Sequence, residues 1–135
     1  MSVLLISAVA ACDEIIIPVM SDFLSARGVE LLLSTIDKIE KALDHKCSYR
    51  LLITMFDKRT NSSLKSLEYF KNKYKNTHFH SIINIDTRFK DASMLRKPLT
   101  YIDVHARGAM DYINVAREII DGFNSSVESG EEGKI

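Results

Sequence analysis

The stretch EIIIPV at residues 14–19 is the segment that most directly indicates the fold. It is a β-branched apolar run closed by proline, which predicts a strand buried on both faces. The segments YRLLITM at 49–55 and FHSIINI at 79–85 have the same character and predict two further strands. Amphipathic stretches separate these runs, which is the pattern of βα units around a mainly parallel sheet. The sequence therefore predicts an α/β fold, a partial doubly wound, mainly parallel sheet flanked by helices.

The stretches between the strands are predicted to be helical. Residues 28–43 place Val29, Ile36 and Ile39 at helical spacing, and Asn61 is the expected N-cap of the next helix. The predicted helices span 3–12, 28–43, 61–75, a short turn within 86–95, and about 108–123. Residues 124–135 are rich in Ser, Gly and Glu, so we expect one α/β domain over 1–123 and a polar flexible tail over 124–135.

Composition limits the classes of function. A chain of 135 residues, with 46% apolar and 27% charged residues, is typical of one soluble globular domain. The 18 basic and 18 acidic side chains cancel, so a nucleic-acid surface would have to be a local patch. No apolar run approaches the roughly 18 residues of a membrane span. Cys12 and Cys47 are too few for a disulfide framework, and we expect two thiols in a reducing, cytoplasmic compartment.

Four segments carry a family resemblance. They are AACDEIIIPV at 10–19, similar to AAADEVLIPV; LLITMFDKRTN at 51–61, similar to LLTMYDxRTN; TRFKDAS at 87–93 with Lys97-Pro98, similar to VRLSEAPSxGKP; and ARGA at 106–109, similar to SRGA. In this order and spacing they resemble the C-terminal half of the ParA/Soj chromosome and plasmid partition ATPases. Members of that family carry a deviant Walker P-loop and are relatives of MinD. The resemblance covers residues 3 to about 122.

The resemblance implies that ATP and Mg²⁺ are the cofactors of a complete family member. The family's phosphate-binding loop and Mg²⁺-holding aspartate precede the segment that matches residues 2–12. This chain starts at Met1, so we expect it to lack the Walker A loop and the Walker B aspartate. We therefore expect no catalytic residue, no metal site, no cofactor and no ATPase activity for the chain alone.

The resemblance also implies a nucleotide base pocket at the carboxyl ends of two strands. The matching residues are Thr54, Met55 and Asp57 at one strand end and Asn84 at the other. The family usually has Pro-Arg-Asn where this chain has Asn84-Ile85-Asp86. The alternative role for Asp57 is that of a turn residue whose carboxylate accepts backbone N–H groups.

A surface for non-specific DNA is implied in the same way. Arg59 and Arg88 match the family's basic positions best, and Lys90, Lys97 and Arg107 would extend the patch. The alternative is that these are ordinary solvated surface charges. Two to four phosphate contacts would give weak, strongly salt-dependent binding unless a dimer doubled them.

The resulting prediction is the C-terminal portion of a ParA-type ATPase. The complete protein would dimerise with nucleotide, bind DNA without sequence preference and respond to a ParB-like partner. The alternative is a natural truncated ParA-like protein that self-associates or pairs with a complete ParA and regulates it without hydrolysis. A stand-alone DNA-binding module is a third class, and zero net charge disfavours it. The predicted location is cytoplasmic and nucleoid-associated, with no membrane partner.

Overall fold

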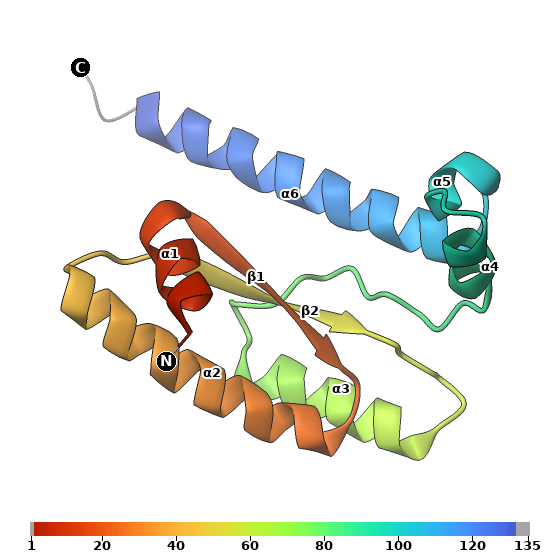
Figure 1. Cartoon of the computed structure of the whole chain (residues 1–135), viewed down its shortest axis with the longest axis horizontal. Helices are drawn as coiled ribbons and strands as arrows, with labels where there is room; N and C mark the ends of the chain where they lie inside the picture. Colours follow the sequence, from red (N-terminus) through yellow and green to blue (C-terminus); the bar gives the residue numbers. More distant parts are fainter. Residues whose placement is uncertain (1, 132–135) are drawn as a thin grey trace. The chain divides into compact units, whose positions relative to one another are not determined.

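The structure is a computed structural model that describes the backbone of residues 2–131 and the side chains of residues 2–122 (Figure 1). The chain divides into two compact units, Met1–His78 and Phe79–Ile135. Each unit has its own buried residues and is described separately below. No helix within residues 2–131 combines the length and the apolar character needed to cross a membrane.

The first unit is built around a two-stranded parallel sheet. Its elements are α1 (Val3–Ala11), β1 (Glu14–Met20), α2 (Phe23–Leu43), β2 (Ser48–Thr54) and α3 (Asn61–Lys73). β1 and β2 pair in parallel, with the register running from Glu14 opposite Ser48 to Met20 opposite Thr54. This confirms the α/β class and the parallel pairing, which are compatible with a fragment of a P-loop NTPase-like fold. The described residues do not form a complete doubly wound sheet.

Local capping chemistry sets the helix starts in this unit. Asp22 accepts a 2.7 Å hydrogen bond from the Ser25 N–H, so α2 begins before the start predicted at Gly28. The predicted cap at Asn61 is wrong, because Thr60 has the extended backbone of an N-cap and its Oγ1 accepts from the Ser63 N–H at 3.3 Å. The predicted helix over 3–12 is confirmed by α1.

The prediction that β1 is buried on both faces is wrong. Ile17 and Val19 are buried, while Ile16, Pro18 and Met20 are exposed. Among the described strands β1 pairs with β2 alone, so its other edge has no neighbouring strand. The 3.2 Å hydrogen bond from the Ser21 N–H to the Thr54 carbonyl shows that the backbone N–H and C=O groups of the odd-numbered residues of β1 point towards β2. Pro18, which has no N–H, therefore faces the open edge, where proline is tolerated.

The predicted third strand at 79–85 is wrong as a strand. An isolated bridge joins Leu51 with His78 just before this segment, where the Leu51 N–H donates to the Thr77 carbonyl at 2.8 Å, and no continuous strand follows within the described residues. Beyond that point, in the second unit, carboxylates of α6 take backbone N–H groups that a ladder would use. Glu118 accepts from the N–H groups of His80 (2.7 Å) and Ser81 (3.0 Å).

Up to residue 131, the second unit contains three helices after that segment. They are α4 (Arg88–Met94), α5 (Leu99–Ile102) and α6 (Arg107–Glu131). Ala92, Leu99, Ala106 and Ala109 form its apolar cluster, and Phe89 packs against it. α6 is the longest helix drawn in Figure 1.

The last helix continues beyond its predicted end near Phe123, since the backbone is helical to Glu131. The predicted polar tail over 124–135 thus begins as helix. Its last four residues, 132–135, lie outside the described residues, and its flexibility stays a prediction.

Candidate functional site

The carboxyl end of β2 holds three of the residues predicted for a nucleotide pocket. The Thr54 hydroxyl donates to the Val19 carbonyl at 3.3 Å, which ties β2 to β1. Met55 follows with a left-handed backbone, φ 52°, and an exposed side chain. Its carbonyl accepts from the Ser21 hydroxyl at 3.1 Å, and that hydroxyl lies 3.0 Å from the Ser63 hydroxyl. A strained conformation in a residue other than glycine is uncommon and marks this turn as a place to look for function.

Asp57 and Arg59 form a compact turn directly after β2. Asp57 Oδ1 accepts from the backbone N–H of Arg59 at 3.0 Å and from its Nε at 2.9 Å, and Oδ2 accepts from Nη2 at 2.7 Å. Asp57 therefore has the turn role that the sequence left open. The Asp57 side chain is 16% exposed, whereas that of Arg59 is 79% exposed. The carboxylate fixes one edge of the guanidinium, raises the pKa of Arg59, and leaves the side chain facing solvent.

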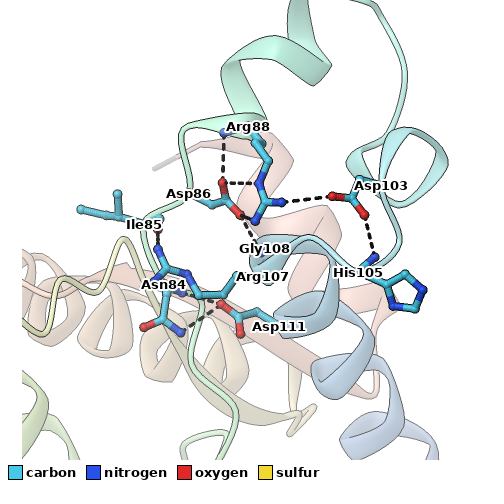
Figure 2. A network of polar contacts seen from close by, with 9 residues as sticks. All are labelled: Asn84, Ile85, Asp86, Arg88, Asp103, His105, Arg107, Gly108 and Asp111. Carbon is cyan, nitrogen blue, oxygen red and sulfur yellow. Dashed lines mark hydrogen bonds and ion pairs between the residues drawn. The ribbon is translucent and has the colours of Figure 1, made fainter.

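The same local device occurs at the start of α4 in the second unit (Figure 2). Asp86 Oδ1 accepts from the Arg88 backbone N–H and from its Nε, both at 3.0 Å, and Oδ2 accepts from Nη2 at 3.0 Å. Here, however, the contacts extend further along the chain. Asp86 Oδ2 also accepts from the Gly108 N–H at 2.9 Å, in the first turn of α6, and Arg88 Nη1 donates to Asp103 at 3.1 Å.

Burial separates the Asp86 turn from the Asp57 turn. The Asp86 side chain is only 6% exposed and that of Arg88 is 43% exposed. The hydrogen bonds from the Arg88 side chain, followed by those from the Gly108 and Arg88 N–H groups, hold the pKa of Asp86 well below its usual range against the opposing effect of burial. Arg88, predicted as a DNA contact, is therefore a structural cross-link between α4, the segment before α6 and, through Asp86, the first turn of α6.

Asn84 and Arg107 are also engaged within this network (Figure 2). The Asn84 N–H and its Nδ2 both donate to Asp111 Oδ2 on α6, at 2.8 and 3.0 Å. The exposed Arg107 donates through Nη2 to the Ile85 carbonyl. Asn84 is thus held in place by α6, and its amide nitrogen already has a protein partner.

Lys90 and Lys97 are exposed. Lys97 is one of the residues that line an open apolar pocket of about 430 Å³, together with Phe89, Leu99 and Tyr112. These two lysines have the exposure that a phosphate contact requires. Within the described side chains no cluster of three or more His, Cys, Asp and Glu residues is arranged to hold a metal ion.

The predicted residues fall into the two units. The first unit holds Thr54, Met55, Asp57 and Arg59, and the second holds Asn84, Arg88, Lys90, Lys97 and Arg107. Their assembly into one base pocket and one DNA surface stays a prediction.

The sequence analysis did not predict several residues of these networks. Asp103 and Asp111 carry no local signal, because their partners lie far away along the chain. The Ser21 and Ser63 pair is likewise separated by 42 positions. In the sequence, an aspartate stands two positions before an arginine at both turns, and this spacing could have predicted the two aspartate–arginine turns.

Comparison with known proteins identifies relatives of this chain. No protein-family model matches it. It is 32% identical over 124 residues to an uncharacterized protein of Mycobacterium tuberculosis, covering 91% of this chain and 39% of that protein. It is 29% identical over 120 residues to the sporulation initiation inhibitor protein Soj of Bacillus subtilis, covering 88% of this chain and 47% of Soj. It is 26% identical over 121 residues to the chromosome partitioning protein ParA of Myxococcus xanthus, covering 89% and 43%.

The chain spans less than half the length of these relatives, while they match about nine-tenths of the chain. The match includes the segments of the strand ends and of both aspartate–arginine turns. The chain is therefore related to the ParA/Soj-type chromosome partitioning proteins over a region that forms part of their length.

Proposed function

We propose that this chain is the C-terminal portion of a ParA-type ATPase that acts in chromosome or plasmid partition. The observation that carries the proposal is the match of about nine-tenths of the chain to proteins named Soj and ParA. ATP hydrolysis, Mg²⁺ binding and nucleotide-dependent dimerisation are then properties of the complete protein. A ParB-like protein is the partner expected to stimulate it.

The carboxyl end of β2 supports a place for the nucleotide base. Ligands of open α/β sheets bind beyond the carboxyl ends of the strands. Met55 offers an exposed apolar side chain there, on a backbone held in a strained conformation. Asp57 and Asn84 are bound to protein groups, so Met55 and the turn backbone are the groups we assign to contact the base.

Arg59 is the residue best suited to contact DNA. Its side chain is highly exposed, and the Asp57 fork reduces the freedom that the guanidinium would lose on binding a phosphate. Lys90, Lys97 and Arg107 are the supporting positions. Arg88 is a weaker candidate than the sequence indicated, because Asp86 and Asp103 surround its charge.

Binding to a non-specific DNA duplex tests this assignment. Fluorescence anisotropy over a salt series is expected to show binding that weakens as salt rises, and Arg59→Ala should weaken binding and reduce the salt slope by about 1. Arg27→Ala is the matched control, because Arg27 is 89% exposed and also has an acidic neighbour, Glu30, at 3.7 Å. Equal losses for Arg59→Ala and Arg27→Ala, or binding without salt dependence, would rule out Arg59 as a specific contact. Nucleoid localisation of a fluorescent fusion should change with the same variant.

A natural short ParA-like regulator is the second candidate function. The observation that favours it is the open edge of β1, together with the exposed apolar side chains of Ile16 and Met20 on β1 and of Phe23 at the start of α2. Such a face suits contact with another polypeptide, which a complete ParA or a second copy would supply. An immunoblot of the native cells separates the two functions. A band well above 15.3 kDa supports the ATPase portion, and a single band at 15.3 kDa supports the regulator.

A further inference from the structure

The second unit contains an open pocket lined by residues of α4, α5 and α6 and of the segment that joins α4 to α5. Its volume of about 430 Å³ lies within the range of cavities that hold small organic ligands in proteins. The buried side chains of Ala92, Leu99 and Ala109 belong both to this lining and to the apolar cluster of the unit. The pocket therefore rests on packed core residues.

Two aromatic side chains of the lining are held in place by protein contacts. The rings of Phe89 on α4 and Tyr112 on α6 meet edge to face, with centroids 5.8 Å apart and an interplanar angle of 89°. The Phe89 ring also lies against Gly108, where an added Cβ would be 2.5 Å from its Cζ. These contacts form without a ligand, so the pocket offers a preformed aromatic surface that loses little freedom on binding.

Lys97 is the one charged side chain among the described residues of this lining. Its backbone is fixed by the turn that ends α4. The Lys97 N–H donates to the Ala92 carbonyl at 3.1 Å, and the Arg96 N–H donates at the same distance to the Ser93 carbonyl. These are the two bonds of a Schellman motif, and Arg96 has the left-handed backbone, φ 51°, that the motif requires. The turn thus fixes the point from which the Lys97 side chain reaches the pocket.

The Lys97 ammonium is available to a ligand. Among the described residues it has no ion-pair partner, whereas Arg88 of the same region is paired with Asp86. The exposed Ser93 and Thr100 also line the pocket, and their hydroxyl groups can donate hydrogen bonds. No acidic side chain is among the described lining residues. The lining therefore favours an apolar ligand that carries a negative charge.

We propose that this pocket is a binding site for a small aromatic carboxylate. The ring of the ligand lies on the buried apolar residues beside the Phe89–Tyr112 pair, and its carboxylate pairs with Lys97 and accepts from a lining hydroxyl group. One lysine matches one carboxylate, whereas the phosphates of a nucleotide would need several cations. The proposal goes beyond the proposed function, which assigns no ligand to this pocket.

Titration of the full isotope-labelled chain with indole-3-propionate, followed by NMR, tests the proposal. The signals of Lys97, Leu99 and Ala109 should shift saturably, with a dissociation constant below about 1 mM for a ligand of this size. The neutral amide of the same acid is the matched control ligand. It should bind about 3- to 10-fold more weakly, because it lacks the charge that pairs with an exposed lysine.

Three variants locate the site. Lys97→Gln should weaken binding of the acid by about 3- to 10-fold and leave binding of the amide unchanged. Lys90→Gln is the matched control, because Lys90 is an exposed lysine of α4 that does not line the pocket, and it should change neither affinity. Thr100→Trp places a bulky ring at an exposed lining position and should weaken both ligands by about 10-fold or more.

Four results would overturn the proposal. They are the absence of a saturable shift, equal binding of the acid and its amide, equal losses for Lys97→Gln and Lys90→Gln, and shifts confined to residues outside the pocket. A peptide that ends in phenylalanine presents the same ring and carboxylate. Binding of that peptide without binding of the free acid would also overturn a small-molecule site. The two lysine variants decide the matter even if Thr100→Trp fails to fold.

Discussion

Removal of the Asp86 carboxylate should destabilise the second unit more than removal of its counterpart at Asp57. In Asp86→Ala, the Arg88 and Gly108 N–H groups lose their acceptor, and the Arg88 side chain loses a two-point fork. Loss of a helix-capping acceptor costs about 1 kcal/mol. Loss of a charge-assisted fork costs a further 1–2 kcal/mol or so, at the lower end because Arg88 is part exposed and water replaces some of the contact. The expected total is about 2–3 kcal/mol of unfolding free energy.

Asp57→Ala is the matched control for this prediction. It removes an aspartate with the same three contacts to an arginine two positions later, but the guanidinium of the Asp57–Arg59 pair is much more exposed than that of the Asp86–Arg88 pair. Its arginine is almost fully exposed, so the expected cost is about 0.5–1 kcal/mol. The excess cost of Asp86→Ala is expected to come from the hydrogen bond that Asp86 accepts from the Gly108 N–H and from the lower exposure of the Asp86–Arg88 pair.

Urea unfolding followed by circular dichroism measures both free energies, and an unchanged dependence on urea would show that stability alone has changed. Amide hydrogen exchange adds a local readout, because the Gly108 N–H should lose protection in Asp86→Ala and keep it in Asp57→Ala. Equal costs for the two variants, or an unchanged Gly108 amide, would refute the structural role assigned to Asp86 and return Arg88 to the DNA candidates.

Three further predictions concern single positions. Gly108→Ala should cost about 1–3 kcal/mol in urea unfolding, because the added Cβ would lie 2.5 Å from Cζ of Phe89; an unchanged midpoint would contradict this packing. Met55→Val should be less stable than Met55→Asn by about 1 kcal/mol in thermal melts, because a left-handed backbone disfavours β-branched residues and tolerates asparagine; the reverse order would exclude the strained turn. The pKa of Asp86 is held low in the folded state, so its contribution to stability is complete above the unfolded pKa of about 3.9 and is lost as the pH falls further. Unfolding free energies measured from pH 6 to pH 2 should therefore fall less steeply for Asp86→Asn than for the wild type.

Periodicity and propensity predicted most of the elements in the first unit. The β-branched runs were sufficient to predict β1 and β2, and the spacing of Val29, Ile36 and Ile39 was sufficient to predict α2. The predicted helix starts were less reliable, because an N-cap is a single residue and both Thr60 and Asn61 are residue types that favour the N-cap position.

The failed strand at 79–85 shows what a local pattern cannot contain. Two of its apolar residues, Phe79 and Ile83, are indeed buried. The segment is not a strand because its backbone N–H groups bond to Glu118 and Asp111, which lie on α6 and far away in sequence. Burial follows from composition, whereas the partner of a backbone group depends on tertiary contacts.

The two aspartate–arginine turns explain why the site was predicted only in part. The family resemblance assigned Arg59 and Arg88 the same role, and the structure gives both arginines the same fork to an aspartate two positions earlier. What distinguishes them is whether a second acidic group and a helix terminus lie within reach of the turn. At the Asp86 turn, Arg88 donates to Asp103, and Asp86 accepts from the Gly108 N–H in the first turn of α6. Arg88 is therefore part of a structural cross-link. Arg59 makes no such contact among its hydrogen bonds and keeps its outward edge in solvent. A basic residue matched by motif should accordingly be assigned to DNA only after its acidic neighbours in the fold are known, and by that criterion Arg59 is the residue whose loss should weaken DNA binding without weakening the fold.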